Sequence, residues 1–488
     1  MSTLLNEISR IGDVNIDLAL TDDTVLNCQK VVRVIPNKRV VCQGVWQGQA
    51  VYAKLFLGAG AAKYQARDAA GVKLLLGAKI DTPPLLYQGK TADNSLLVLV
   101  FAQIYPALNA EQIWVDLNQS QRLNLAKNLV TELAKHHNAG LLQTDLYLKN
   151  FLVSSESIYS LDGDGIRRYT SLNQQHALEN LSVLFSKFDV LEMEVWLDVL
   201  LKTYSKVRAW QVLPDAVLIK ATTNAYRQKV ARNYADKKVF RQCTDVTVVE
   251  NFSALVGLFI AASSHAKINI PTNLSDLDAL MQPQHLLKNG NTCTVALSEM
   301  DNKKIVIKRY NIKNFWHRIS RAFRPSRAAT SWANAHRLNI LGLATAKPIA
   351  LYEQRTFGLR GKAFFLAEYL DLPDVAEYFA KTQDKAQRAE AVKNIVTLFY
   401  KLYLLQISHG DMKATNIKMQ GTQPVLIDLD SMCQHRKTNI TAHVRDLQRF
   451  MQNWQEMPSL YNAFVKTFKV VYPDDSMLVK AGIATNKE

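Results

Sequence analysis

Two separate stretches of this sequence repeat one spacing of polar residues. Each contains an aspartate, an asparagine five positions later and a second aspartate seventeen positions after the first. These residues are Asp145, Asn150 and Asp162 in the first stretch and Asp411, Asn416 and Asp428 in the second. In both, the last aspartate begins an Asp-x-Asp triplet, which ends at Asp164 or Asp430. A repeat of this kind constrains the fold strongly, because it predicts two copies of one structural unit.

The segments around each motif repeat as well. A strand-turn-strand pattern ends in a lysine, Lys54 in the first copy and Lys308 in the second. Each lysine is followed by a helical pattern and then by "GAKIDTPPLLY" or "GLATAKPIALY", in which proline ends the helix and precedes a strand. Apolar residues at helical spacing over 125–133 and 392–403 then predict an amphipathic helix before each motif.

The repeat predicts two domains of the α+β class. The chain has 488 residues, which is long for one hydrophobic core. Each domain is expected to be bilobal, with a β-rich N-lobe before the motif and a helical C-lobe around it. The expected ranges are 1–262 for the first domain (N-lobe about 1–103, C-lobe about 104–262) and 280–488 for the second (N-lobe about 280–370, C-lobe about 371–488).

Composition excludes several other classes of protein. With 48% hydrophobic and 21% charged residues, the chain is globular and not disordered. The five cysteines are scattered and never form CxxC, so neither a zinc cage nor a disulfide framework is indicated. The first residues lack the pattern of a signal peptide, and the apolar run near 253–262 is too short to span a bilayer. We therefore expect a cytoplasmic location.

The repeated residue types are suited to phosphoryl transfer. This reaction needs a charge clamp on the nucleotide phosphates, magnesium ligands and a carboxylate beside the attacking hydroxyl. A lysine on a strand can reach the phosphates, and an aspartate in a loop can accept the proton of an alcohol. The asparagine and the later aspartate offer oxygen ligands, which suit Mg²⁺ and not Zn²⁺. Alternatively, the two lysines are ordinary solvent-exposed residues of their strands.

At these residues the sequence resembles the protein-kinase-like superfamily. Within it, the sequence is similar to the lipopolysaccharide kinase family, which phosphorylates Kdo or heptose of the lipid A core. The resemblance is carried by "HGDMKATN" and "LIDLD" in the second half, by "TDLYLKNF" and "LDGD" in the first, and by "RPSRAATSWANAHRLNILGLATAKPIAL". It extends over nearly the whole chain, with one copy in each half, and so implies two kinase-like domains in tandem.

The resemblance implies a role for each matching residue. Asp411 would be the catalytic base, Lys413 would contact the transferred phosphate, and Lys308 would bind the nucleotide. Asn416 and Asp428 would hold Mg²⁺. The matching residues of the first half are Asp145, Lys54, Asn150 and Asp162. ATP and Mg²⁺ are the implied cofactors.

Three further residues of the motif allow two readings. Asp430 and Asp164 could join the magnesium ligands or could cap the next turn, for which aspartate is well suited. His409 could act as a general base, but its usual task in this motif is to bond nearby backbone.

Each half also departs from the kinase pattern. A kinase needs an acidic partner for its strand lysine. The second half has no acidic residue between Asn302 and Tyr352, whereas the first half offers Asp68. Tyr147 stands where the second half has a lysine, and "QT" replaces "HG" before the first aspartate. Neither half has a GxGxxG loop; Gly48 and Gly290, the latter in "KNGNTCTV", are lone glycines, and Gly290 is expected to bind the nucleotide.

The charge of the chain is concentrated in one segment. The formal net charge is +16, and residues 302–352 contain eleven Lys or Arg and no acidic residue. In "NFWHRISRAF" aromatic and basic side chains fall on different sides of a predicted helix, and two more arginines follow. We expect the arginines Arg318, Arg321, Arg324 and Arg327 to bind the cytoplasmic face of the inner membrane. The alternative is a packed lobe helix with a solvated face.

These features predict an ATP-dependent phosphotransferase that acts on a sugar hydroxyl, of Kdo or heptose, in the lipopolysaccharide inner core. Its acceptor would be an anionic, lipid-linked saccharide. A protein Ser/Thr kinase is the nearest alternative enzyme, and a regulatory pseudokinase tandem with one or both halves inactive is the alternative from another class. Nucleic-acid binding is not expected, since no aromatic stacking platform or known module accompanies the basic run.

Overall fold

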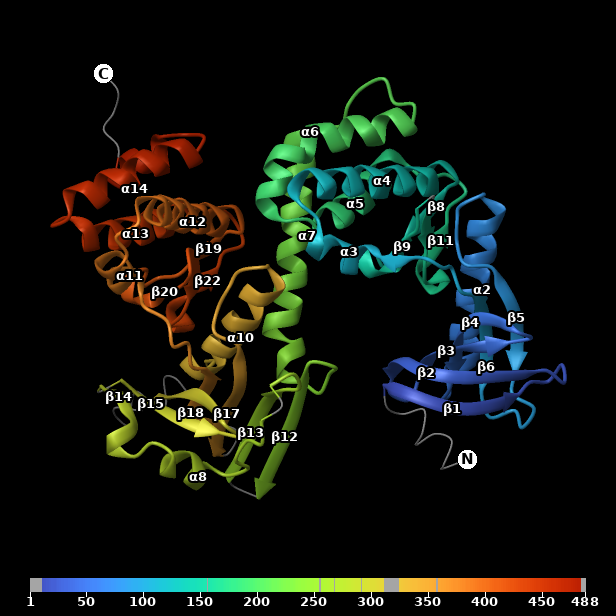
Figure 1. The fold of residues 1–488 in the computed structure, drawn as a ribbon, viewed down its shortest axis with the longest axis horizontal. Helices are drawn as coiled ribbons and strands as arrows, with labels where there is room; N and C mark the ends of the chain where they lie inside the picture. Colours follow the sequence, from blue (N-terminus) through green and yellow to red (C-terminus); the bar gives the residue numbers. More distant parts are fainter. Residues whose placement is uncertain are drawn as a thin grey trace. The chain divides into compact units, whose positions relative to one another are not determined.

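The computed structural model separates the chain into two units, Met1–Tyr226 and Arg227–Glu488 (Figure 1). It describes residues 11–155, 157–253, 256–266, 268–290, 292–310, 324–356 and 359–483. Each unit contains a large antiparallel sheet and a group of helices, which confirms the α+β class. Within the described ranges, no helix is both long enough and apolar enough to cross a membrane.

The large sheet of the first unit has the described strand order β1-β2-β3-β4-β6-β5. Its strands are β1 (Gly12–Ala19), β2 (Val25–Ile35), β3 (Arg39–Trp46), β4 (Gln49–Phe56), β5 (Leu85–Lys90) and β6 (Leu97–Ala102). Buried and less buried side chains alternate along β3, because successive residues of a strand point to opposite faces. One face is buried around Leu26, Val31, Val51 and Val98, which form part of the core of this lobe.

Helix α2 (Ala61–Gly77) connects this sheet with the repeated motif. It follows β4, and its residue Val72 packs in a buried cluster with Leu99 of the sheet. Its other contacts include η2 (Gly163–Gly165), the turn that follows the second aspartate of the motif. The helix therefore lies between the strand that carries Lys54 and the Asp-x-Asp turn.

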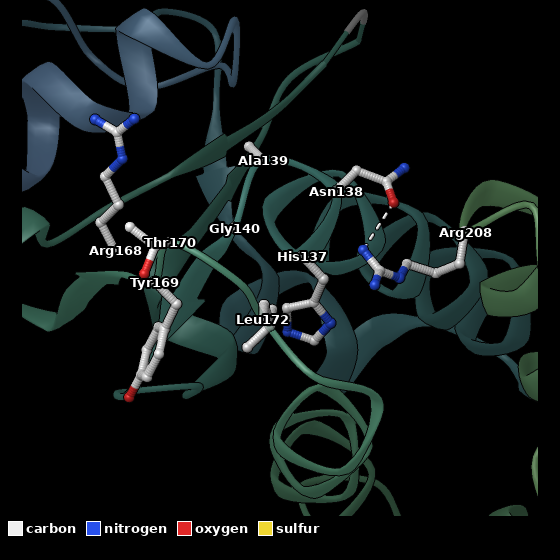
Figure 2. Close-up of a pocket in the computed structure, with 9 residues that line it drawn as sticks. All are labelled: His137, Asn138, Ala139, Gly140, Arg168, Tyr169, Thr170, Leu172 and Arg208. Carbon is white, nitrogen blue, oxygen red and sulfur yellow. Dashed lines mark hydrogen bonds between the residues drawn. The ribbon is translucent and has the colours of Figure 1, made fainter.

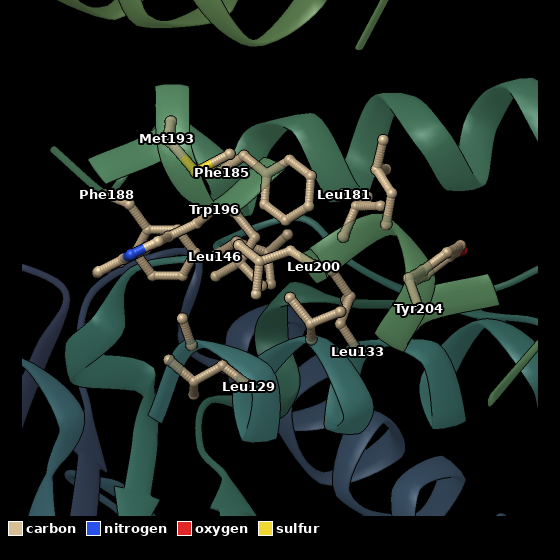
Figure 3. Close-up of a cluster of buried hydrophobic side chains, with 14 of the residues drawn as sticks. Leu129, Leu133, Leu146, Leu181, Phe185, Phe188, Met193, Trp196, Leu200 and Tyr204 are labelled. Atoms are coloured by element: carbon tan, nitrogen blue, oxygen red, sulfur yellow. The ribbon is translucent and has the colours of Figure 1, made fainter. Parts of the chain in front are cut away.

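The C-terminal lobe of the first unit is mainly helical. Its elements are β7 (Leu108–Asn109), α3 (Ala110–Asp116), α4 (Gln119–Asn138), β8 (Leu141–Gln143), η1 (Leu148–Asn150), β9 (Phe151–Val153), β10 (Ile158–Ser160), β11 (Ile166–Arg168), α5 (Gln174–Phe185) and α6 (Val190–Val207). Helix α7 (Ala216–Asp236) follows and contains the division after Tyr226. Asn118 begins α4 with a capping box. Leu129 and Leu133 of α4 face Trp196 and Leu200 of α6 in the buried cluster of Figure 3, which confirms the predicted helix before the motif.

The large sheet of the second unit has the described order β12-β13-β17-β18-β16-β15-β14. Its strands are β12 (Val246–Ser253), β13 (Val256–Ser263), β14 (Leu286–Asn289), β15 (Cys293–Met300), β16 (Lys303–Tyr310), β17 (Pro348–Thr356) and β18 (Leu359–Glu368). Helix α10 (Arg327–Ile340) lies between β16 and β17 in the chain and packs on the sheet through Trp332. The short elements α8 (Leu274–Ala279) and η4 (Pro283–His285) precede β14.

The C-terminal lobe of the second unit resembles that of the first in its order of elements. It contains α11 (Val375–Lys381), α12 (Lys385–Leu404), β19 (Ile407–Ser408), η5 (Ala414–Asn416), β20 (Ile417–Gln420), β21 (Gln423–Leu426), η6 (Leu429–Ser431), β22 (Cys433–Gln434), α13 (Ile440–Met451), η7 (Gln452–Trp454), α14 (Pro458–Val471) and α15 (Ser476–Lys480). Asp384 caps α12, whose buried face includes Ile395, Phe399 and Leu402. The amphipathic helix predicted over 392–403 is thus confirmed.

Five strands occupy equivalent places in the two large sheets. The order β2-β3-β4-β6-β5 in the first unit corresponds to β14-β15-β16-β18-β17 in the second. In both units the helix, α2 or α10, follows the third of these strands in the chain. The additional strands differ, because β1 extends one edge in the first unit and the hairpin β12–β13 extends the opposite edge in the second.

The division between the units differs from the predicted boundary near residues 262–280. The structure divides the chain after Tyr226, and β12 and β13 belong to the second sheet. Strand β13 pairs with β17 from Val256↔Thr356 to Ala262↔Ala350. This pairing buries Phe259, Ile260 and Ala261 in the second unit. Residues 256–262 of the predicted apolar run therefore lie in a strand of the second unit and not at the end of the first.

Candidate functional site

The central residues of the second motif lie in one short loop. Asp411 follows β19, and Asn416 ends η5 with a buried side chain. The Asn416 amide Nδ2 donates to the backbone carbonyl of Asp411 at 2.8 Å and to its carboxylate at 3.2 Å. Asn416 in turn accepts a backbone hydrogen bond from Ile427, at 3.0 Å, directly before Asp428. Asp411 and Asn416 therefore meet within the loop, and the hairpin β20–β21 returns the chain so that Asp428 follows close to Asn416.

Two cations accompany the Asp411 carboxylate. Lys413 Nζ lies 3.2 Å from one oxygen, and a guanidinium nitrogen of Arg449, on α13, lies 3.5 Å from the other. Partial burial would raise the pKa of Asp411, but Lys413, Asn416 and Arg449 lower it below its ordinary value. The carboxylate, 34% exposed, is thus ionised at neutral pH and open to a partner from solvent. Arg449 was not predicted from the sequence, because it lies on a later helix outside the motif.

A buried carboxylate holds the backbone of this loop. Asp446 on α13 accepts hydrogen bonds from the backbone N–H of His409 at 2.6 Å and of Gly410 at 2.9 Å. Burial raises the pKa of Asp446, against the effect of these amides. Gly410 has φ +81°, and a Cβ there would lie 2.7 Å from the carbonyl oxygen of Ser431, so glycine is required. His409 Nε2 donates to the carbonyl of Ile427 at 3.0 Å, as the structural reading of this histidine predicts.

The strand lysine of the second unit contacts both aspartates of the triplet. Lys308 Nζ on β16 donates to Asp428 and, at 2.9 Å, to Asp430. Arg327, the first residue of α10, donates to the same Asp430 oxygen at 2.8 Å. Asp428 has φ +59°, which turns the chain sharply at the end of the motif. Asp430 is only 4% exposed, whereas the Asp428 side chain is 35% exposed.

These contacts show what replaces the missing acidic partner of Lys308. Burial would lower the pKa of Lys308, but the Tyr310 phenol and the carboxylates of Asp428 and Asp430 raise it above its ordinary value. Burial would raise the pKa of Asp430, yet Lys308 and Arg327 lower it. The partner therefore comes from the Asp-x-Asp turn, while α10 contributes a cation.

Of the four arginines predicted to bind a membrane, only two lie within the described residues. The segment 311–323, which contains Arg318 and Arg321, lies outside the described residues. Arg324 is exposed, and Arg327, the last of the four predicted arginines, is paired with Asp430 within the protein. Asn334 of α10 donates to the carbonyls of Leu429 and Met432, both at 2.9 Å, and so fastens the same turn.

Gly290 lies in the connection from β14 to β15. Its backbone N–H donates to the carbonyl of Cys293 at 3.1 Å. A Cβ at this position would lie 3.1 Å from the same carbonyl oxygen, which is tight and suits glycine.

The strand lysine of the first unit pairs with the helix, as predicted. Lys54 Nζ donates to Asp68 on α2 at 2.6 Å and to Asp162 at 3.3 Å. Arg39, the first residue of β3, donates to the same two oxygens at 3.4 and 3.5 Å. Complete burial raises the pKa of Asp68, while Lys54 and Arg39 lower that of Asp162 despite its burial. Arg39 was not predicted, since no motif marks it.

The end of the first triplet also binds an arginine of the helix. Arg67 of α2 forms a bidentate pair with Asp164, its second contact measuring 2.8 Å. This corresponds to the pair of Arg327 and Asp430 in the second unit. In both units, an arginine of the helix therefore binds the second aspartate of the triplet, Asp164 or Asp430.

The loop that carries Asp145 in the first unit has the geometry of the Asp411 loop, but other side chains form its hydrogen bonds. Asn150 Nδ2 donates to the carbonyl of Asp145 at 2.8 Å, as Asn416 does in the second unit. Gln143 replaces the histidine and donates to the carbonyl of Leu161 at 3.1 Å. Asn180 replaces the buried aspartate of α13 and donates, at 2.9 Å, to the carbonyl of Gln143. Asn180 thus holds the loop through a carbonyl and not through amides.

Tyr147 takes the place of Lys413 in the first unit. The Lys187 ammonium lies 4.3 Å from the centroid of its ring, at cation–π distance. Burial raises the pKa of Tyr147, and the neighbouring Asp145 raises it further. This position therefore presents a neutral phenol where the second unit presents a cation.

A cavity of about 500 Å³ lies elsewhere in the first unit (Figure 2). Its lining is His137, Asn138, Ala139, Gly140, Arg168, Tyr169, Thr170, Leu172 and Arg208. Arg208 donates to Asn138 at 2.8 Å, as drawn in Figure 2. None of the predicted site residues lines this cavity.

The donor groups of the second unit fit a magnesium nucleotide. The Asp428 carboxylate is partly exposed. Asn416 directs its amide nitrogen to Asp411, so its amide oxygen is the atom left to bind a metal. Mg²⁺ prefers such oxygen ligands, and it retains several waters, so that two protein ligands suffice. Among the described residues, no group of three or more His, Cys, Asp or Glu side chains is placed to hold a metal.

A strand lysine, a loop aspartate with its asparagine, and a later aspartate define a kinase-type site in the second unit. A model of the lipopolysaccharide kinase (Kdo/WaaP) family matches residues 278–472. The match lies within the second unit and confirms the predicted resemblance for these residues. The family consists of kinases, so the predicted enzyme class is confirmed.

The solved structures that match parts of the chain include the following two. One structure, "WaaP in complex with acyl carrier protein", has 16% identity and a TM-score of 0.30, with 44% of this chain and 94% of that chain covered. The other, "Structure of vaccinia related kinase 3", has 13% identity and a TM-score of 0.29, with 47% and 95% covered. No curated protein matches the chain.

Proposed function

We propose that the second unit transfers the γ-phosphate of ATP to a sugar hydroxyl of the lipopolysaccharide inner core, of Kdo or of heptose. The observation that carries this proposal is the ionised, solvent-accessible Asp411 carboxylate, bonded to Asn416 and flanked by Lys413, within residues that match the lipopolysaccharide kinase family. The first unit, which has the same order of five strands, would be a second kinase-like domain in tandem.

The roles of the side chains follow from their contacts. Asp411 would orient the acceptor hydroxyl and take its proton, because its lowered pKa keeps it ionised as a hydrogen-bond acceptor. Lys413, at 3.2 Å, would balance the charge of the transferred phosphate. Lys308 would contact the nucleotide phosphates from β16, where Asp428 and Asp430 keep it charged and directed into the site.

Asn416 and Asp428 would hold Mg²⁺ in the second unit. When bound, the ion would neutralise the phosphate charge and align ATP for transfer. Asp430 would not be a ligand, because Lys308 and Arg327 share one of its oxygens and the side chain is almost completely buried. Its task would be to fix Lys308.

The acceptor is proposed to be an anionic, lipid-linked saccharide, and the protein would reach it at the cytoplasmic face of the inner membrane. The support is the sequence of the basic run, in which Arg318, Arg321 and Arg324 accompany aromatic residues. Arginines of such a segment can bind lipid phosphates while aromatic rings enter the acyl boundary.

The decisive experiment measures phosphate transfer by the full-length protein from labelled ATP to lipid A that carries Kdo, with or without heptose. Asp411→Asn should reduce transfer by at least about a hundredfold, the usual size of general-base catalysis, while folding and nucleotide binding remain. The matched variant Asp145→Asn should leave most of the transfer. Transfer only to a protein substrate would favour the alternative Ser/Thr kinase, and undiminished transfer by Asp411→Asn would contradict the assignment.

A further inference from the structure

The two units place different residues at one position beside the strand lysine. In the first unit Arg39 pairs with Phe56, two residues after Lys54. In the second unit Cys293 pairs with Tyr310, two residues after Lys308. Arg39 and Cys293 therefore occupy the same register position on equivalent strands, β3 and β15, and only the first unit has a cation there.

The cation at this position contacts the aspartate that would hold a metal. Arg39 donates to Asp162 Oδ1 at 3.5 Å, and Lys54 donates to the same oxygen at 3.3 Å. The guanidinium is 12% exposed and also contacts the buried Asp68. In the second unit, Lys308 is the one cationic side chain among the described residues that pairs with Asp428. Asp162 thus has two cationic partners where its counterpart has one.

The donor set of the first unit consequently does not fit Mg²⁺. A magnesium ion binds a carboxylate oxygen at about 2.0–2.1 Å. An ion on Asp162 Oδ1 would therefore lie within about 6 Å of the cationic nitrogens of both Lys54 and Arg39. The Asp162 side chain is 17% exposed, about half of the 35% for Asp428, so water offers less screening and fewer ligands. Two fixed positive charges already neutralise Asp68 and Asp162.

We propose that Arg39 takes the place of a divalent cation beside Asp162, so that the first unit has no magnesium-nucleotide site and the second unit alone carries the transfer. This inference rests on the proposed function for the second unit. It deepens that function by assigning the two motif copies different tasks, and it changes the predicted role of Asp162 and Asn150 as metal ligands.

The loop of the first unit supports the same assignment independently. Tyr147 presents a phenol in place of the Lys413 ammonium, so no cation from this position can balance a transferred phosphate. Asn180 donates to a carbonyl, whereas Asp446 accepts from two amides, so the backbone beside the aspartate is held by a different bond. The changes therefore affect both the metal position and the position of the transferred group.

The test counts divalent ions on the full-length protein. Mn²⁺, which takes the same oxygen ligands as Mg²⁺, is titrated with a non-hydrolysable ATP analogue, and its binding is followed by electron paramagnetic resonance. Asp428→Asn should abolish the nucleotide-dependent Mn²⁺ binding, whereas Asp162→Asn should remove none of it. Loss of about half of the bound Mn²⁺ in Asp162→Asn would overturn the inference.

Reciprocal substitutions at the register position provide the matched pair. Arg39→Cys, which copies the second unit, should add nucleotide-dependent Mn²⁺ binding that Asp162→Asn then removes. Cys293→Arg, which copies the first unit, should lower the Mn²⁺ affinity of the second unit at least tenfold. Retained Mn²⁺ binding in Cys293→Arg would overturn the inference. Mn²⁺ binding that Asp428→Asn does not change would instead contradict the proposed function, and the two failures are therefore distinguishable.

Discussion

Asp446 accepts a hydrogen bond from the backbone N–H of His409 at 2.6 Å, and this contact joins α13 to the loop that carries Asp411. The same carboxylate accepts from Gly410 at 2.9 Å. Asn180, the counterpart of Asp446 in the first unit, cannot accept in this way at its amide nitrogen and donates to a carbonyl instead. One atom change between aspartate and asparagine thus distinguishes how two similar loops are held.

Asp446→Asn should lower both stability and transfer. The asparagine nitrogen would face a backbone N–H, and losing this buried acceptor costs about 1–3 kcal/mol in the free energy of unfolding. The turnover number should fall more than the Michaelis constant for ATP rises, because the loop positions Asp411 and not the nucleotide. Chemical denaturation and steady-state kinetics would measure the two effects. Asn180→Asp, the reverse change in the first unit, should destabilise the protein with transfer retained; equal loss of transfer would contradict a division of tasks.

The pH dependence of transfer should follow the partners of Asp411. Its pKa lies below the ordinary value, so the acid limb of the rate should lie below about pH 3.9, the value for a free aspartate. Lys413→Ala removes the nearer cation and should shift this limb to higher pH. Arg449→Gln should shift it less, because Arg449 is more distant and 55% exposed. If neither variant shifts the acid limb of the rate, a group other than Asp411 determines it.

Asp430→Asn should destabilise the second unit at neutral pH by about 3 kcal/mol, because Arg327 loses its carboxylate partner and Lys308 keeps only the more exposed Asp428. Since Lys308 and Arg327 lower the Asp430 pKa, its contribution is complete above the unfolded pKa and is lost as the pH falls through the folded value. The difference from the native protein should therefore shrink toward low pH. Urea denaturation at several pH values would measure it.

The matched control for this variant is Asp371→Asn. Its carboxylate is 78% exposed and lies 3.6 Å from Lys304, so its loss should change stability by less than about 1 kcal/mol. A loss as large as that of Asp430→Asn would mean that charge number and not burial determines the effect.

Reversal of Arg318, Arg321 and Arg324 to glutamate should release the protein from vesicles that contain anionic lipid. Each basic residue near such a surface contributes about 1 kcal/mol, so the affinity should fall at least a hundredfold. Co-sedimentation with vesicles would measure it. The control reverses three exposed lysines on α14 and α15 and changes the net charge equally. The control residues are Lys466, Lys469 and Lys480. If both sets of substitutions reduce vesicle binding equally, the binding depends on net charge and not on these three arginines.

Much of the fold could be read from local patterns. The helices before each motif are confirmed because their apolar faces repeat at helical spacing and their first residues cap them, as Asn118 and Asp384 do. The predicted boundary near residues 262–280 differs from the division after Tyr226, because an apolar hairpin carries no sign of which sheet it will join. Strand β13 joins β17, almost a hundred residues later, and only that pairing assigns it to the second unit.

The sequence by itself determined the repeat, the short loop that carries Asp411 and Asn416, and the hairpin β20–β21 that leads on to Asp428, since turns of a few residues are decided by neighbours in the chain. Tertiary structure decided which cations reach the aspartates. Arg39 and Arg327 lie more than a hundred positions from Asp162 and Asp430, and strand register and helix packing bring each pair together. Such contacts leave no periodic pattern, because the two partners are selected by the sheet and the helix between them.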